Sequence, residues 1–391
     1  MHRRTMLKGL GAVASLPLLG SAAHAEDTVK IGLILPMTGQ SASTGKQIDA
    51  AVKLFMAQNG DSVAGKKVQV ILKDDTGVAD VTKRLAQELI VNDKVAVLAG
   101  FGLTPLALAV APLATQAKVP EIVMAAATTI ITQKSPYIVR TSCTLPQTTV
   151  PLADWAAKNG IKTVVTLVSD YGPGIDAAKA FKGRFTKAGG KITGELTAPL
   201  RNPEFAPFLQ KVRDLKPDAL FLFVPSGQGA ALMKQVAERE LTKAGIKVIA
   251  TGDVTDDDQL PDMGDSVLGM VTTHFYSAAH PSPENKAFVA AFEKANPKMR
   301  PNFMAVGGYD GMHLIYEALK KTGGKTDGTA LVDAMKGASW TSVRGPVKID
   351  PATREIIQTV YVRKVEKVDG QLYNIEFDKI PDVVPPSPDG N

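Results

Sequence analysis

Three short segments among the first 130 residues combine hydroxyl side chains with glycine or alanine, each directly after an apolar run. Such segments leave backbone N–H groups accessible, and together with a hydroxyl group they can bind a carboxylate or a carbonyl oxygen. The alternative is an ordinary close-packed turn between a strand and a helix. The segments and their candidate ligand-binding residues are Pro36–Gly45 with Thr44, Gly100–Pro105 with Thr104, and Ala125–Thr129 with Ala126 and Thr128.

Thr104 stands directly before Pro105 and an apolar helical pattern. Because threonine is favoured at the N-cap and proline at the first helical position, we predict that Thr104 is the N-cap of a helix. Its hydroxyl group would then either cap that helix only, or also hold an oxygen atom of a ligand. The two roles are compatible.

Three further segments of this kind follow apolar runs beyond residue 160. Tyr171 precedes a glycine turn, where it would either cover one face of a ligand or pack on its own lobe. Asp253 lies nearest to the end of an apolar run, so its carboxylate could pair with a ligand cation or accept from an N–H or O–H group. Asp256–Asp258 lack the spacing of an EF-hand, and we expect them to be solvated or to cap the next helix. The three segments are Ser169–Gly174, Pro225–Gln228 and Gly252–Asp258.

The usual signatures of catalysis and of metal or cofactor binding are missing from the sequence. Gly100 and Gly102 are followed by Pro105 where a dinucleotide-binding fingerprint needs its third glycine, and Ser226 does not lie in a G-x-S-x-G motif. Cys143 is the only cysteine, which excludes an intrachain disulfide. We therefore expect no enzyme activity, cofactor or metal site. The histidines beyond residue 25, none at a paired metal-binding spacing, are His274, His280 and His313.

Short apolar runs alternate with helical patterns such as Gln47–Asn59. The runs are rich in Val, Ile and Leu with little polar alternation, which indicates strands of a parallel sheet that is buried on both faces. The expected fold class is therefore α/β. The predicted strands are Val29–Leu35, Val68–Lys73, Val95–Ala99, Glu121–Met124, Thr163–Val168, Ala219–Val224, Val248–Thr251 and Leu268–Thr273.

The strand–helix series runs twice, which predicts two lobes. Long helical patterns follow at Pro283–Ala295 and Pro301–Lys320, and alternating strands at Gln358–Glu366 and Gln371–Phe377. We expect one lobe to comprise residues 28–141 and 277–343, the other residues 142–276 and 344–380, and 381–391 to form a loose tail.

The first 25 residues have the pattern of an export signal, with a basic start, the apolar run Leu10–Leu19 and an A-x-A site at Ala23–Ala25. Arg3 and Arg4 fit both a twin-arginine and a general secretory signal. Removing this segment lowers the formal net charge from +6 to +3, which does not suggest nucleic-acid binding. No later window is long and apolar enough to span a membrane, so we expect a periplasmic protein that is not embedded in the membrane.

In order and spacing, several short motifs resemble the Leu/Ile/Val-binding family, the periplasmic substrate-binding proteins of branched-chain amino acid ABC transporters. The resemblance covers nearly the whole chain after the signal. The motifs are Lys30–Gly32, Pro36–Gly39 with Gly45, Asp74–Asp75, Ala126–Thr128, Ser135–Tyr137, Arg140–Thr141 and Asp170–Gly172.

The resemblance implies a type I periplasmic binding fold, with two Rossmann-like lobes joined by three crossovers that close on a ligand. It also implies a carboxylate site at Thr104 with help from Ala126 and Thr128, and an acidic partner for an α-amino group at Asp253. The stretch 128–132 is one residue shorter than the usual pattern, and the usual serine-rich run before Thr104 is absent. The remaining residues that the resemblance and position nominate are Tyr171, Ser226, Gln228 and Tyr276.

These observations predict an exported solute-binding protein of an ABC importer. It would capture a small polar organic ligand, namely an amino acid, an amide or an aromatic acid, and deliver it to the permease subunits. The alternative is the ligand-sensing domain of a receptor or regulator with the same fold.

Overall fold

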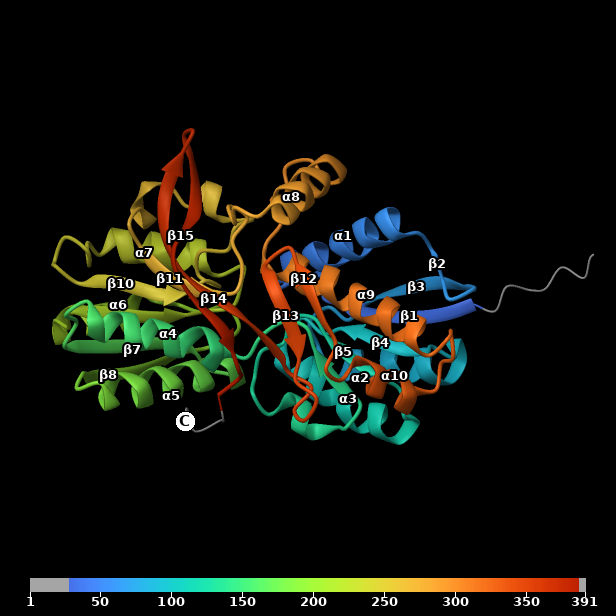
Figure 1. The fold of residues 1–391 in the computed structure, drawn as a ribbon. Helices are drawn as coiled ribbons and strands as arrows, with labels where there is room; N and C mark the ends of the chain where they lie inside the picture. Colours follow the sequence, from blue (N-terminus) through green and yellow to red (C-terminus); the bar gives the residue numbers. More distant parts are fainter. Residues whose placement is uncertain (1–27, 387–391) are drawn as a thin grey trace, which may run out of the picture.

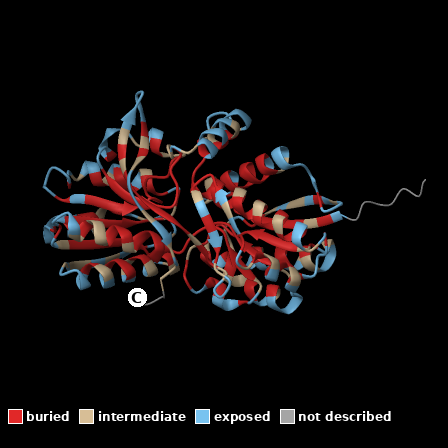
Figure 2. Cartoon of the chain, viewed as in Figure 1, coloured by how far each residue is buried: buried red, intermediate tan, exposed pale blue. Residues whose placement is uncertain are grey.

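The computed structural model describes residues 28–386, so the predicted signal peptide and residues 387–391 lie outside the described part of the chain. Two α/β lobes lie side by side, each built on its own sheet (Figure 1). Within each lobe the central strands are buried between helices, and strands toward the sheet edges are partly exposed (Figure 2). This is the two-lobed α/β architecture that the alternation of apolar runs and helical patterns predicts.

The first lobe has a six-stranded sheet in the order β2-β3-β1-β4-β5-β6, parallel except for β2. Helices α1, α8, α9 and α10 contribute to the apolar cluster on one face, and α2 and α3 to the cluster on the other. The strands are β1 (Thr28–Leu35), β2 (Ser62–Val63), β3 (Lys66–Asp74), β4 (Val97–Gly100), β5 (Glu121–Val123) and β6 (Ile138–Arg140). The helices are α1 (Ala42–Asn59), α2 (Ala79–Glu88), α3 (Thr104–Ala117), α8 (Pro283–Ala295), α9 (Phe303–Lys321) and α10 (Gly328–Met335).

The second lobe has a nine-stranded sheet. Its parallel part has the order β8-β7-β9-β10-β11 and continues through antiparallel β14, β13 and β12, while β15 pairs with β14. Helices α4 and α5 cover one face, and α6 and α7 the other. The strands are β7 (Thr163–Ser169), β8 (Lys191–Ala198), β9 (Ala219–Phe223), β10 (Lys247–Thr251), β11 (Val271–His274), β12 (Ser339–Ser342), β13 (Gly345–Ile349), β14 (Ile356–Val368) and β15 (Gln371–Val383). The helices are α4 (Leu145–Lys158), α5 (Gly172–Lys187), α6 (Ala206–Leu215) and α7 (Gly229–Glu238).

The chain passes between the lobes three times, after β6, after β11 and along β13 and β14 (Figure 1). Val347, Ile349 and Ile356 pack into the core of the first lobe, whereas Val362, further along β14, packs into the second. A single long strand therefore belongs to both cores. The lobe borders expected from the sequence stay a prediction.

Each predicted strand coincides with an observed one, and the helix over Pro283–Ala295 is confirmed. The sequence does not predict β2, β6, β8, β12 and β13, because they are short or carry exposed polar residues. The expectation of a loose tail from residue 381 needs correction. β15 continues to Val383, which pairs with Gln358 of β14, so backbone pairing orders this segment although it contains proline.

Candidate functional site

The carboxyl ends of strands from both lobes meet in one cleft, as expected for open α/β sheets. Its inner part is a cavity of about 30 Å³, and its outer part is a chamber of about 410 Å³. Both parts are lined by Leu103, Pro225 and Ser226, so the two spaces adjoin. The inner cavity is lined by Thr44, Gly102, Leu103, Thr104, Ala125, Ala126, Ala127, Leu145, Tyr171, Pro173, Phe223, Pro225, Ser226, Asp253 and Met304.

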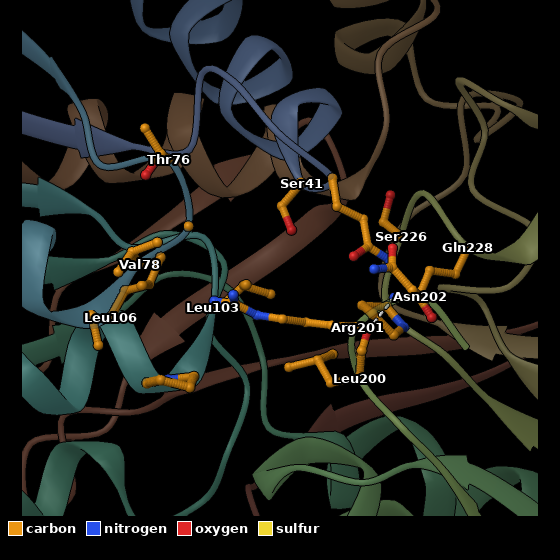
Figure 3. Close-up of a pocket in the computed structure, with 15 residues that line it drawn as sticks. Ser41, Thr76, Val78, Leu103, Leu106, Leu200, Arg201, Asn202, Ser226 and Gln228 are labelled. Carbon is orange, nitrogen blue, oxygen red and sulfur yellow. Dashed lines mark hydrogen bonds between the residues drawn. The ribbon is translucent and has the colours of Figure 1, made fainter. Parts of the chain in front are cut away.

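The outer chamber separates loops of the first lobe, which carry Ser41 and Leu103, from loops of the second, which carry Arg201 and Gln228 (Figure 3). The Arg201 side chain points across the chamber toward Leu103. Arg201 is the one charged residue that lines this chamber in the described part of the chain. The mouth of the cleft therefore attracts anions more than cations.

On the first-lobe wall, the hydroxyl groups of Thr104 and Thr128 lie 2.8 Å apart and are both buried. The prediction that Thr104 is an N-cap is wrong by one position, because Leu103 is the N-cap and Thr104 begins α3. The Thr104 hydroxyl is thus engaged with Thr128 instead of capping its helix. One hydrogen bond between two hydroxyl groups uses one proton, so the pair retains a second proton for an external acceptor.

The second-lobe wall carries an aromatic pair. The rings of Tyr171 and Phe223 stack with centroids 6.1 Å apart and an interplanar angle of 21°. Burial raises the pKa of the Tyr171 hydroxyl well above its usual range, and the nearby charge of Asp253 acts in the same direction. Tyr171 therefore stays a neutral phenol that presents an apolar ring and a hydroxyl group.

Asp253 brings a buried carboxylate to the inner cavity. Its Oδ2 atom lies 3.6 Å from Nε2 of His274 and has no hydrogen-bond partner within residues 28–386. Burial lowers the pKa of His274, which favours a neutral imidazole at neutral pH. A buried acceptor without a partner is costly, and an N–H or O–H group of a ligand would satisfy it.

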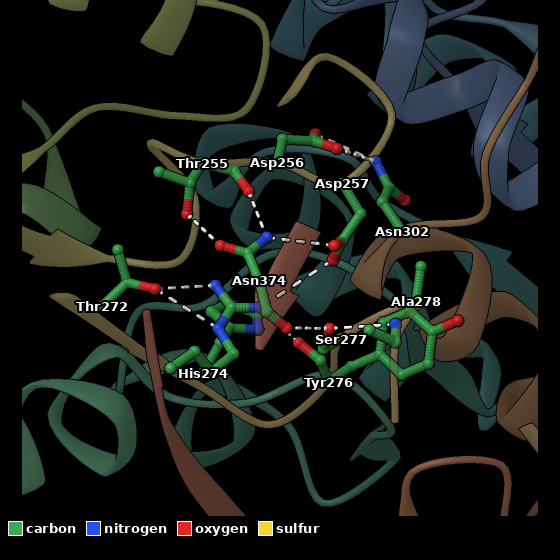
Figure 4. Close-up of polar contacts among 12 residues, drawn as sticks. Thr255, Asp256, Asp257, Thr272, His274, Tyr276, Ser277, Ala278, Asn302 and Asn374 are labelled. Carbon is green, nitrogen blue, oxygen red and sulfur yellow. Dashed lines mark hydrogen bonds and ion pairs between the residues drawn. The ribbon is translucent and has the colours of Figure 1, made fainter. Parts of the chain in front are cut away.

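Asp256 and Asp257 are each only 1% exposed, so the expectation that they are solvated or cap a helix is wrong. Asn302 donates from Nδ2 to both carboxylate oxygens of Asp256 at 2.9 Å, and Asn374 donates to Asp257 at 3.0 Å (Figure 4). Desolvation raises the pKa of Asp256 to about 7. Asparagines distant in sequence donate to both carboxylates, which no local pattern reveals.

The lobes also touch directly at the rim of the cleft. Thr129 of the first lobe donates from its backbone N–H and its hydroxyl to Asp176 of α5, each at 2.8 Å. Ser43 donates to Asp258 at 3.3 Å. These contacts join α5 and the loop after β10 to the first lobe, and they depend on the cleft being closed.

The sequence profile of the periplasmic binding protein family matches residues 28–371. Leu/Ile/Val-binding protein homolog 6 of Brucella abortus is 45% identical over 373 residues, which cover 94% of this chain and 95% of that protein. The chain belongs to the periplasmic binding protein family.

Two solved periplasmic binding proteins of this kind have aromatic acids in their complexes. An ABC transporter solute-binding protein from Rhodopseudomonas palustris BisB5, solved with 3,4-dihydroxybenzoic acid, is 67% identical with a TM-score of 0.91, and the match covers 92% of this chain and 99% of that one. One from Rhodopseudomonas palustris HaA2, solved with p-hydroxybenzoic acid, is 43% identical with a TM-score of 0.89, covering 92% and 98%.

In this periplasmic binding protein, the structure brings most of the predicted site residues together. Gln228 lines the outer chamber, and Thr128 is coupled to the inner cavity through Thr104. Tyr276 is not brought there, because it is fully buried in the first-lobe core beside the hinge. The predicted residues that line the inner cavity directly are Thr44, Thr104, Ala126, Tyr171, Ser226 and Asp253.

Sequence reasoning missed several apolar residues that line the inner cavity. Phe223 ends β9, so the rule that ligands bind at strand ends could have found it. Met304 lies at the start of α9, which returns to the first lobe after a crossing, and no local signal places it in the cleft.

No helix within residues 28–386 is long and apolar enough to cross a membrane.

Proposed function

We propose that this chain is the solute-binding protein of an ABC importer and that its ligand is a small aromatic carboxylic acid with a ring hydroxyl group. The observation that carries the proposal is the inner cavity, where a stacked aromatic pair lies beside a buried carboxylate oxygen that accepts no hydrogen bond from residues 28–386. The ligand of the 67% identical solute-binding protein, 3,4-dihydroxybenzoic acid, has the matching groups.

The ring of such a ligand would lie against the apolar part of the wall, formed by Tyr171 and Phe223 of the second lobe and Met304 of the first. Aromatic rings in offset-stacked or edge-to-face contact gain about 0.5–1.5 kcal/mol beyond the burial of their area. A branched-chain amino acid has no ring to use these contacts.

The carboxylate of the ligand would lie at the first-lobe wall, beside Thr104 and Thr128 at the start of α3. The free proton of the hydroxyl pair and the N-terminal end of the helix both favour an anion. The ring hydroxyl would donate to Asp253 from the opposite lobe. The ligand thus bridges the lobes, and it stabilises the closed form because the complete set of contacts exists only there.

The same carboxylate of Asp253 would also accept from the ammonium group of an amino acid, which is why an amino acid is the second candidate. The flat aromatic wall favours the aromatic acid. The receptor alternative is not favoured, because the similar solved proteins are transporter components. In the periplasm the protein would carry the ligand to the permease subunits of the importer, without converting it chemically.

Isothermal titration calorimetry against 4-hydroxybenzoate, 3,4-dihydroxybenzoate, benzoate, leucine and urea tests the proposal. We expect the hydroxybenzoates to bind more tightly than benzoate, and leucine and urea to give no measurable heat. In a matching thermal unfolding series, the unfolding temperature should rise with hydroxybenzoate concentration, because a ligand at 100 times its Kd stabilises the native state by about 2.7 kcal/mol. Tight leucine binding without hydroxybenzoate binding would assign the protein to amino acid transport.

A further inference from the structure

The Ser226 hydroxyl group lies between the inner cavity and a buried carboxylate. Ser226 lines the cavity and is only 5% exposed. On its other side its hydroxyl is hydrogen-bonded to Oδ2 of Asp256. Either oxygen-bearing group could in principle supply the proton, so the direction of this bond decides what Ser226 can offer a ligand.

The neighbours of Asp256 require it to accept. Its carboxylate receives the side-chain amide of Asn302 at 2.9 Å on both oxygens and the backbone N–H of Asp258 at 2.9 Å (Figure 4). N–H groups cannot accept, so a proton on Oδ1 would face two donors, and a proton on Oδ2 could only be taken up by Ser226. These N–H contacts stabilise the ionised carboxylate, which predominates above the Asp256 pKa of about 7, and in that form Asp256 accepts from Ser226.

The amide of Asn302 cannot turn over to relieve this requirement. Asn302 is the N-cap of α9, and its Oδ1 atom accepts from the backbone N–H groups of Met304 at 2.9 Å and Ala305 at 3.2 Å. Turning the amide would place an NH₂ group against two N–H groups. The helix terminus thus fixes which face of Asn302 points to Asp256, and Asp256 in turn fixes the proton of Ser226.

With its single proton committed to Asp256, Ser226 presents only lone pairs to the cavity. Asp253 presents a second acceptor from the same lobe. We infer that Ser226 and Asp253 together select an aromatic acid that carries two neighbouring ring hydroxyl groups, with Asp256 and Asn302 as positioning residues that make Ser226 an acceptor. The inference rests on the proposed function and narrows its ligand to the catechol type.

Calorimetry at pH 8, where Asp256 is ionised, with 3,4-dihydroxybenzoate, 3-hydroxybenzoate and 4-hydroxybenzoate tests the inference, because the three ligands share the ring and the carboxylate. The parent protein should bind the dihydroxy acid about tenfold more tightly than the better monohydroxy acid. In Ser226→Ala this preference should disappear, because the affinity for the dihydroxy acid falls by about tenfold toward that of the better monohydroxy acid.

Asp256→Asn distinguishes a positioning role from a purely structural one. Asparagine can donate an N–H to Ser226, which frees the serine proton to turn toward the cavity, so the preference for the dihydroxy acid should fall while a monohydroxy acid still binds. Asp262→Asn, on the exposed part of the same loop, is the matched control and should keep the parent preference. Thermal unfolding of each variant establishes that it is folded.

Two results would overturn the inference in different ways. If the parent binds hydroxybenzoates and Ser226→Ala keeps the full preference for the dihydroxy acid, the selection by Ser226 is wrong and the proposed function stands. If the parent binds none of the three aromatic acids, the proposed function fails and the inference fails with it.

Discussion

Gly172 is the position where a single methyl group should keep the cleft from closing. It is the first residue of α5 in the second lobe, and a Cβ atom there would lie 2.4 Å from Oγ1 and 3.1 Å from Cγ2 of Thr128 in the first lobe. Ordinary contacts of a Cβ atom begin at about 3.4 Å. Gly172→Ala therefore requires the lobes to separate by about 1 Å at this point, or Thr128 to move away from Thr104.

Overpacking of this kind typically costs about 1–3 kcal/mol. Because the clash lies between the lobes, this cost falls on the closed, ligand-bound form, and the affinity for a hydroxybenzoate should drop by about 5- to 150-fold. Alanine before Pro173 adds a local cost at the start of α5, since a residue that precedes proline disfavours the helical region. That local cost is present with and without ligand, so it appears in the unfolding temperature of the unliganded protein.

Calorimetry and thermal unfolding on the parent, Gly172→Ala, Thr128→Ala and the double variant separate the two costs. The double variant removes Oγ1 and Cγ2 of Thr128, the two closest atoms, so it should bind more tightly than the sum of the single effects predicts. Strictly additive effects, or parent-like affinity in Gly172→Ala, would refute the idea that this contact belongs to the ligand-bound state.

Three further predictions concern the site and its surroundings. Thr104→Ala and Asp253→Ala should each weaken hydroxybenzoate binding by about 1–3 kcal/mol in calorimetry, because each removes a hydrogen bond to a buried or charged group; parent-like binding by both variants would refute the site. Asp176→Ala removes the acceptor of both hydrogen bonds from Thr129, so the affinity of the variant for hydroxybenzoate should fall by about tenfold. Small-angle scattering of the ligand-saturated variant should give a larger radius of gyration than the parent. An unchanged radius of gyration and Kd would argue against this rim contact. Asp256 faces the charges of Asp258 and Arg363, and its pKa is raised to about 7. Between about pH 4 and 7 the folded protein therefore holds a proton on Asp256 that the unfolded chain has released. The free energy of unfolding should accordingly be higher at low pH and fall as the pH rises toward 7. Denaturant titrations of the parent and Asp256→Asn from pH 5 to 8 should show a steeper fall in the parent, and parallel curves would contradict the assignment.

The limits of sequence reasoning are clearest at the aspartates after β10. Their position at a strand end correctly nominates Asp253 for the cleft, because the end of an apolar run can be read from a short stretch of chain and ligands bind at the carboxyl ends of strands. The partners of Asp256 and Asp257 are not local. Asn302 and Asn374 reach them from segments that follow later lobe crossings, so the sequence alone suggested solvent where the structure has buried hydrogen bonds.

By itself, the sequence determined the alternation of buried strands and helices, and with it the α/β class, the two lobes and the loops that carry the site. This is possible because the apolar pattern of buried strands and the residues that form turns can be recognised within short stretches of chain. Only the tertiary structure decided that Thr104 bonds to Thr128, that Met304 enters the cleft and that Asn302 fixes Asp256 and Ser226. Those contacts join residues from different elements, and their geometry depends on how two separately packed cores are held together across the hinge.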